Sequence, residues 1–214
     1  MLKGFPKYAF GTMAFLAVAI ALQSMRYIAV PWGVWLGVGD DIRGVIEHVP
    51  LQMLTHAIVA PFALLTGPFQ FLPGLRARRP ALHRWTGRVY VSACLIAGLA
   101  ALATAPFASG GPIAGTGFGV LAALWVSATF AAWRAAVARK IDLHRVLMRF
   151  SYAMTFGAVT LRLQIPIGFM LGYTSYAAMS VWLAYTSWIP NVIVVALYSL
   201  ARGAPRQTVP AGAG

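Results

Sequence analysis

The sequence is poor in charged residues, and above all in acidic ones. Only 10% of its 214 residues are charged, and four of them are Asp or Glu. A soluble domain carries about 25% charged residues, so this chain lacks the polar surface that a water-soluble fold needs. With so few carboxylates, neither a two-carboxylate hydrolase nor a relay of carboxylates that carries protons across a membrane is well supported.

Cysteine and the usual catalytic motifs are also scarce. Cys94 is the single cysteine and lies in an apolar run, so we expect it to pack as a small hydrophobic residue. No Cys/His spacing indicates a zinc site. The sequence also contains no catalytic-triad motif, Gly-rich phosphate loop or HExxH. We therefore name no catalytic residue, and the sequence leans towards a protein that is not an enzyme.

Hydrophobic residues, by contrast, make up 60% of the chain, and its mean hydropathy is +0.74. Apolar runs of about 20 residues are long enough to cross a membrane. The runs predict transmembrane helices at about 8–25, 50–72, 89–107, 117–136, 150–171 and 176–200. We expect an all-α bundle of six transmembrane helices as a single domain over residues 1–202, followed by a short disordered tail at 203–214.

The basic residues lie in short clusters between these runs. Two lie near the N-terminus, five in each of two basic segments and two in the tail, which is fourteen of the 17. By the positive-inside rule, this asymmetry predicts a bacterial inner-membrane protein with both termini in the cytoplasm. The same placement argues against nucleic acid as a partner, despite the net charge of +13. The bilayer is the expected partner, with a membrane protein complex or a homo-oligomer as further possibilities.

Several runs carry small or polar residues at spacings of three and four, which places them on one face of a helix. Such residues let membrane helices approach closely and hydrogen-bond to one another, so packing explains most of the Ser and Thr positions. The faces are His56, Ala60, Ala63, Gly67 and Gln70; His83, Gly87, Tyr90, Cys94, Ala97 and Ala101; Ser151, Thr155, Ala158 and Arg162; and Ser180, Ala184, Ser187 and Asn191.

Arg162 stands apart, because a guanidinium deep in a span must meet an acceptor. The acceptor is an acid of the first outer loop (Asp40, Asp41 or Glu47), a backbone carbonyl group or a bound anion. The arginine is then either part of a ligand site or a purely structural lock. His56 is expected at a similar depth. The candidates for ligand binding are His56, Gln70, Arg162, Gln164 and Asn191.

His83 and His144 begin two of the predicted helices, and two histidines from separate helices are the minimum for a bis-histidine haem b. An arginine follows each histidine by five residues, however, which places both histidines near the membrane surface. The favoured interpretation is an interfacial basic collar that binds lipid headgroups or caps helices. Its arginines are Arg84, Arg88, Arg145 and Arg149.

A set of short motifs between about residues 50 and 195 resembles a bacterial family of predicted membrane proteins known as domain of unknown function 2306. The motifs are His56 with Gly67-Pro68-Phe69-Gln70-Phe71, Leu82-His83-Arg84-Trp85, Gly87-Arg88-Val89-Tyr90, His144-Arg145, Met148-Arg149, Thr160-Leu161-Arg162-Leu163 with Pro166, and Trp188-Ile189-Pro190-Asn191. The resemblance implies a multi-helix membrane fold and no established activity. The chain also has a looser similarity to b-type cytochromes. It implies at most one haem, because the fourth and sixth runs contain no histidine.

Three functions remain, in order of preference. The first is a non-catalytic accessory or ligand-binding membrane protein that uses the region of His56 and Arg162. The second is a redox subunit that binds one haem b or a quinone. The third is a small-molecule transporter. Against transport, we expect no broken pair of helices, and the similar segments at 82–90 and 143–152 open helices that run in parallel directions.

Overall fold

The structure, a computed structural model, describes residues 7–29 and 45–203, and every regular element in these ranges is a helix. Six helical stretches in the described part are long and apolar enough to cross a membrane. They are Tyr8–Met25, Pro50–Phe71, Pro80–Phe107, Gly111–Val137, Ile141–Met170 and Tyr176–Ala201. The prediction of an all-α bundle with six membrane-spanning helices is confirmed.

Ten helical elements of the described ranges build these six spans. The first three spans are α1 (Lys7–Ala29), α3 (Pro50–Thr66) continued by the 3-10 turn η2 (Pro68–Phe71), and α5 (Pro80–Thr104) continued by η3 (Ala105–Phe107). The short helix α4 (Pro73–Arg78) joins the second span to the third, and α6 (Gly111–Val137) is the fourth. The fifth span consists of α7 (Ile141–Thr155) and α8 (Gly157–Met170), and the sixth of α9 (Tyr176–Thr186) and α10 (Ile189–Gly203).

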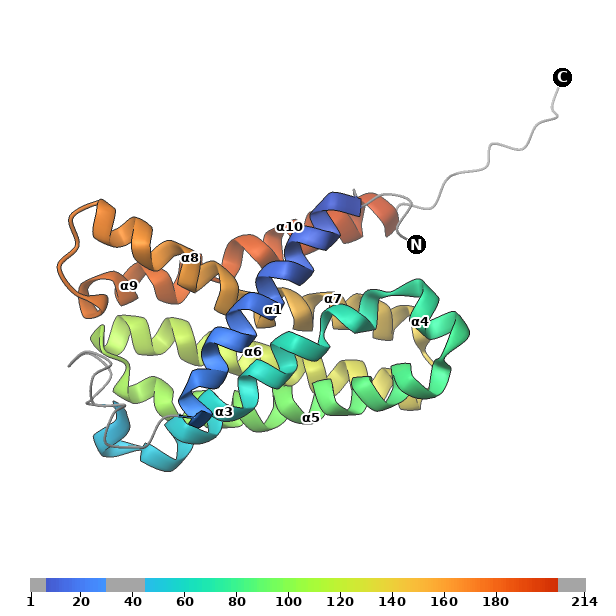
Figure 1. The fold of residues 1–214 in the computed structure, drawn as a ribbon, viewed down its shortest axis with the longest axis horizontal. Coiled ribbons are helices and arrows are strands. Elements are labelled where there is room, and N and C mark those ends of the chain that lie inside the picture. Colours follow the sequence, from blue (N-terminus) through green and yellow to red (C-terminus); the bar gives the residue numbers. More distant parts are fainter. Residues whose placement is uncertain (1–6, 30–44, 204–214) are drawn as a thin grey trace, which may run out of the picture.

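The helices form one bundle (Figure 1). Helix α5 packs between α3 and α6, α6 packs against α7 and α9, and α10 packs against α7. Helix α1 crosses α3 and contacts α8. The start of α1, the helix α4, the connection from α6 to α7 and the end of α10 all lie at the same end of the bundle. Which side of the membrane this end faces stays a prediction.

Three predicted spans begin too late. Helix α5 begins at Pro80 instead of 89, α6 at Gly111 instead of 117, and α7 at Ile141 instead of 150. The basic segments were expected to be loops, yet Arg88 and Arg149 lie within helices. A long arginine side chain can carry its charge to the interface from within a helix, so charge does not mark the helix end. The predicted tail lies outside the described residues, except Gly203 in α10.

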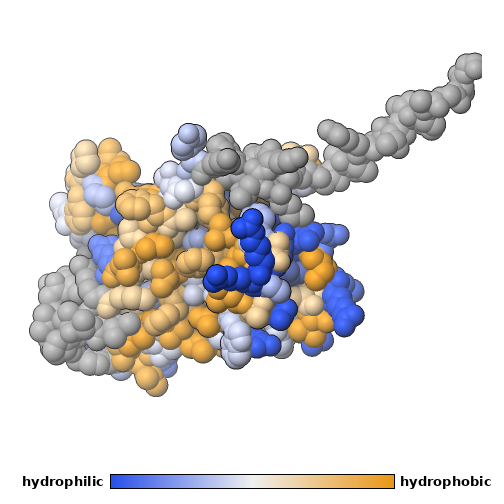
Figure 2. Space-filling view, turned by 45° about the vertical axis from the view of Figure 1, so that its right-hand side comes forward, coloured by the Kyte–Doolittle hydropathy of each residue, from blue (hydrophilic) through white to orange (hydrophobic). Residues whose placement is uncertain are grey.

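Hydrophobic side chains cover most of the surface visible in Figure 2, and the most hydrophilic ones gather towards the end where α4 lies. Large side chains such as Ile96, Leu124 and Leu197 are about half exposed or more. In water this surface would be unfavourable, whereas in a bilayer it contacts lipid chains of the same polarity. The surface therefore agrees with a membrane as the solvent.

The core between α3, α5, α6 and α7 is built around aromatic side chains and small residues. Tyr90, Trp125 and Tyr152 are buried together with several alanines. Gly67 lies directly against the ring of Tyr152, and a Cβ at this position would collide with it. Close helix approach at small residues is therefore what closes this core.

The fifth and sixth spans are each interrupted, so the expectation of no broken helix pair is wrong. Phe156 separates α7 from α8, and Ser187 and Trp188 separate α9 from α10. Pro190 explains the second break, because it has no N–H to donate to the carbonyl group of Thr186 four residues earlier. The Nε2 of Gln164 donates to that carbonyl oxygen instead, at 3.3 Å.

Candidate functional site

A cavity of about 1010 Å³ lies among α1, α3, α6, α7, α8 and α9. Its walls are mostly apolar and include Ile20, Leu64, Phe118, Leu121 and Ile165. Ligand pockets in proteins have volumes of about 300–1,000 Å³ and combine apolar walls with a few polar groups. The cavity therefore has the size and the lining of a site for a small molecule.

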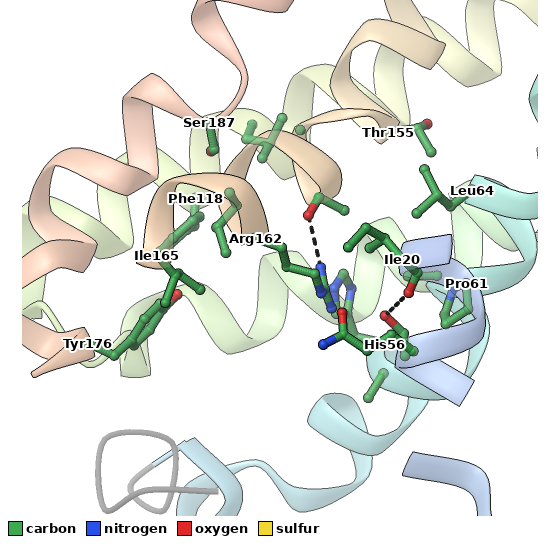
Figure 3. A pocket seen from close by; sticks show the side chains of 18 of the residues that line it. Ile20, His56, Pro61, Leu64, Phe118, Thr155, Arg162, Ile165, Tyr176 and Ser187 are labelled. Carbon is green, nitrogen blue, oxygen red and sulfur yellow. Dashed lines mark hydrogen bonds between the residues drawn. The ribbon is translucent and has the colours of Figure 1, made fainter. Parts of the chain in front are cut away.

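Arg162 and His56 supply polar groups to this cavity (Figure 3). Arg162 lies on α8 and its Nη1 donates to the carbonyl oxygen of Ala158, one turn earlier, at 3.1 Å. Among the described residues that line the cavity, it is the one with a formal charge. One of the predicted acceptors, a backbone carbonyl group, is thus confirmed. Asp40 and Asp41 lie outside the described residues, and Glu47 is exposed.

His56 comes from α3 and is fixed by a bond to a neighbouring helix. Its Nδ1 lies 3.0 Å from the carbonyl oxygen of Ala97 on α5. A carbonyl oxygen only accepts, so Nδ1 is the donor. This bond sets the orientation of the ring, which lies beside the Arg162 side chain in Figure 3.

The other three predicted ligand-binding residues do not line the cavity. Gln70 donates through Nε2 to Thr86 Oγ1 at 2.9 Å, near the start of α5. Gln164 is paired with Thr186, because Thr186 Oγ1 also donates to Gln164 Oε1 at 3.1 Å. Asn191 lies beside the break in the sixth span. The structure thus brings together His56 and Arg162 from the predicted set and leaves Gln70, Gln164 and Asn191 elsewhere.

Asn191 ties the two breaks together. Its Nδ2 lies 3.1 Å from the carbonyl oxygen of Ser187 and 3.3 Å from that of Ala153, which belongs to the other broken span. The breaks also touch directly, because a Cβ on Gly157 would lie 3.3 Å from the Cβ of Trp188. Gly157 and Ser187 both line the cavity. Two adjacent helix breaks therefore form part of its wall.

A cluster of buried hydroxyl groups adjoins the cavity on the side of α7. The Tyr90 hydroxyl lies 2.8 Å from Ser151 Oγ and 3.0 Å from Thr155 Oγ1, and Trp125 Nε1 donates to Thr155 Oγ1 at 2.9 Å. Thr129 Oγ1 lies 2.6 Å from Ser151 Oγ. These contacts join α5, α6 and α7, and they agree with the prediction that the Ser and Thr positions serve packing.

His83 and His144 lie near the starts of α5 and α7 and interact electrostatically with each other. His144 Nδ1 donates to the carbonyl oxygen of Ala132 at 2.9 Å, since that oxygen only accepts. His83 Nδ1 is buried and has no hydrogen-bond partner among the described residues. Nothing in this geometry tests the haem, so the haem prediction stays a prediction.

The four arginines of the predicted basic collar lie near these histidines, within the first three turns of α5 and α7. They are Arg84, Arg88, Arg145 and Arg149. Arg88 lies over the ring of Trp85, 4.8 Å from its centroid, and Arg149 lies 5.5 Å from the ring centroid of Tyr198. Arg145 pairs with Asp142 at 3.0 Å. Arginine and aromatic side chains together are typical of a membrane interface.

A comparison with known protein families identifies a match that covers residues 53–199, more than half of the chain, to the family described as predicted membrane protein (DUF2306). This chain belongs to the DUF2306 family. The resemblance seen in its motifs is therefore confirmed. No curated protein and no solved structure matches the chain. The DUF2306 match begins in α3 and ends in α10, so it includes His56, Arg162 and both helix breaks.

Two features of this DUF2306 chain escaped the sequence analysis. The first is the pair of helix breaks, although Pro190 gives a signal for the one in the sixth span. The second is the role of Trp125 and Thr129, which complete the hydroxyl cluster from α6. Both residues look like ordinary members of an apolar run, so no sequence signal distinguishes them.

Proposed function

We propose that this membrane protein binds a small amphipathic anion in the cavity and acts as an accessory or ligand-binding protein without chemistry of its own. The observation that carries the proposal is the position of Arg162, a permanent positive charge in a cavity with mostly apolar walls. A guanidinium group has five N–H donors, so it can bind an anion in addition to the contacts that Arg162 makes within the chain. An acidic ligand that also has a hydrocarbon part complements both the charge and the walls.

The chemistry of the two polar residues narrows the class of ligand. A planar guanidinium group binds carboxylates and phosphates through two parallel hydrogen bonds, which an ammonium group cannot do. His56 adds an oriented imidazole ring beside it. The apolar walls formed by Leu64, Phe118 and Ile165 would hold the hydrocarbon chain. A long-chain carboxylate or alkyl phosphate fits these requirements.

Photolabelling tests this proposal. The protein is purified into nanodiscs of zwitterionic lipid and labelled with a photoreactive palmitate, with palmitate or hexadecanol as competitor. We expect labelling of α1, α3 or α8 that palmitate blocks and hexadecanol does not. Arg162→Gln should weaken labelling at least about tenfold, because a hydrogen bond to a charged group contributes about 1.5–3 kcal/mol.

The matched control is Arg145→Gln, which removes a cation from the collar instead of the cavity and should leave labelling unchanged. Equal labelling of Arg162→Gln and the wild type would contradict the proposal. Competition by hexadecanol as strong as that by palmitate would also contradict it, since the cavity would then select only for a hydrocarbon chain.

Transport is a second candidate function, and the adjacent helix breaks favour it. Discontinuous helices that meet beside a binding site near the middle of the membrane are a feature of many secondary transporters. Uptake of radiolabelled octyl phosphate into proteoliposomes tests this function. Uptake that requires the protein and is lost in Arg162→Gln supports transport, whereas binding without uptake supports the accessory role alone.

The redox alternative rests on His83 and His144, or on a quinone in the cavity. Its test is the visible absorption spectrum of the purified protein before and after dithionite. A Soret band that sharpens on reduction, with α and β bands, supports a single haem b and makes the two histidines its candidate ligands. A colourless protein argues against haem.

For the location, we propose the bacterial inner membrane with both termini in the cytoplasm. The support is the basic residues of α4, of the start of α5 and of the connection from α6 to α7. These elements lie at one end of the bundle, the end that the positive-inside rule assigns to the cytoplasm. A membrane complex or a homo-oligomer stays a further proposal, to be tested by the mass of the protein in nanodiscs.

A further inference from the structure

Ser187 lines the cavity and carries a buried hydroxyl group. Its side chain is 1% exposed, and its Oγ has no hydrogen-bond partner in the described part of the chain. Ser187 lines the cavity, and in the view of Figure 3 Arg162 lies between it and His56. Most buried polar groups in proteins are hydrogen-bonded, because a buried group without a partner loses the bonds that it makes in water. This hydroxyl group therefore calls for a partner.

The helix break explains why the chain itself supplies no partner. A serine within a helix often donates to the carbonyl group one turn earlier, but Ser187 lies where α9 has ended. The backbone around it is satisfied. Its N–H donates to Leu183 O at 3.1 Å, its own carbonyl oxygen accepts from Asn191, and Trp188 Nε1 donates to Ala184 O at 2.7 Å. Of the polar groups of Ser187, only its hydroxyl group has no hydrogen-bond partner in the described part of the chain.

Thr155 provides a comparison in the same wall. It lines the cavity too, but its Oγ1 accepts from Trp125 Nε1 and donates to the carbonyl oxygen of Ser151 at 3.0 Å. Those contacts commit it to the packing of α6 against α7. Of these two hydroxyl groups from the broken spans, Ser187 is thus the one available to a bound molecule.

We infer that the cavity contains a second polar subsite at Ser187, which binds a hydroxyl or carbonyl oxygen carried part-way along the chain of the amphipathic anion. The inference rests on the proposed function, because it takes Arg162 as the site of the acidic group. It narrows the ligand class to hydroxylated or oxidised long-chain acids. A plain hydrocarbon chain would cover the Ser187 hydroxyl group without bonding to it.

The test compares stearate with a series of stearates that carry a hydroxyl group at successive chain positions, each as competitor of the photoreactive palmitate. In the wild type, at least one isomer should compete roughly three- to tenfold more strongly than stearate, the range expected for one hydrogen bond. Ser187→Ala should remove this preference and leave competition by stearate unchanged. Ser180→Ala is the matched control, since Ser180 lies on α9, does not line the cavity and donates to Ala177 O.

The results separate a failure of the Ser187 subsite from a failure of the proposed function. If no isomer exceeds stearate, or if Ser187→Ala keeps the preference, the subsite is wrong. If stearate itself does not compete, the proposed function fails first. Ser187→Cys, which keeps a weak donor at nearly the same volume, covers the case in which the alanine variant does not fold. It should retain part of the preference.

Discussion

The hydroxyl groups around Tyr90 link three helices through single atoms. Tyr90, Ser151 and Thr155 are each buried, and each has at least one partner on another helix. In a bilayer, where apolar burial does not hold helices together, such bonds and close packing carry the association. The positions of the residues beside the cavity therefore depend on hydrogen bonds that a single substitution can remove.

Tyr90→Phe tests this link. Removing the hydroxyl group takes a partner from Ser151 and Thr155, so the free energy of unfolding should fall by about 0.5–1.5 kcal/mol. The measurement is an SDS titration of the detergent-purified protein, followed by circular dichroism. Tyr173→Phe, at an exposed position in the connection between α8 and α9, is the control and should change little. Equal effects of the two substitutions would show that the cluster does not stabilise the fold.

At the scale of single residues, the sequence predicts only in part which groups the polar side chains of the spans contact. The three- and four-residue spacing indicates that His56 and Arg162 face the interior, and the two side chains do meet at the cavity. Asn191 has the same spacing and Gln164 lies two residues after Arg162, but both bond to carbonyl groups freed by the break in the sixth span. A polar residue in an apolar run has the same sequence pattern whether it faces a cavity or hydrogen-bonds to a backbone carbonyl group. Spacing therefore cannot separate the two roles.

Among the elements, the paired break in α7–α8 and α9–α10 has a mechanism that can be tested. Pro190 cannot donate to Thr186 O, and Gln164 does so in its place. Gln164→Leu should therefore destabilise the wild-type protein by about 1 kcal/mol. In a Pro190→Ala background the restored N–H can reach Thr186 O, so the same substitution should cost less.

A double-mutant cycle gives the coupling of the two positions. Unfolding in SDS is measured for the wild type, both single variants and the double variant. Identical effects of Gln164→Leu in the two backgrounds would show that Gln164 does not replace the helical donor. The matched control is Gln70→Leu, whose partner Thr86 is distant from the break and whose effect should not depend on Pro190.

The elements also show where hydrophobic runs mislead. Runs of apolar residues predict that six helices exist, because each crossing needs about 20 of them. They miss that α5 starts at Pro80 and α7 at Ile141, since arginines within the first turns look like loop residues. They also miss the breaks, because a run stays apolar across Ser187 and Trp188 while its hydrogen bonds do not continue.

For the whole molecule, the shared end of α1, α4 and α10 predicts a labelling pattern. After Cys94 is replaced by alanine, Ala138→Cys in the connection from α6 to α7 and Tyr173→Cys in that from α8 to α9 each introduce one exposed thiol. In intact cells, a membrane-impermeant thiol reagent should label Tyr173→Cys and spare Ala138→Cys. Both should react after lysis. Labelling of Ala138→Cys alone in intact cells would invert the proposed orientation.

The central claim is that the cavity holds an acidic amphiphile at Arg162, and native mass spectrometry of the protein released from its own membrane tests it most directly. The account predicts that wild-type protein and Arg145→Gln carry the same bound acidic molecule, and that Arg162→Gln loses it while remaining folded. A wild-type protein without a bound acidic molecule, or an Arg162→Gln variant that keeps it, would contradict the account.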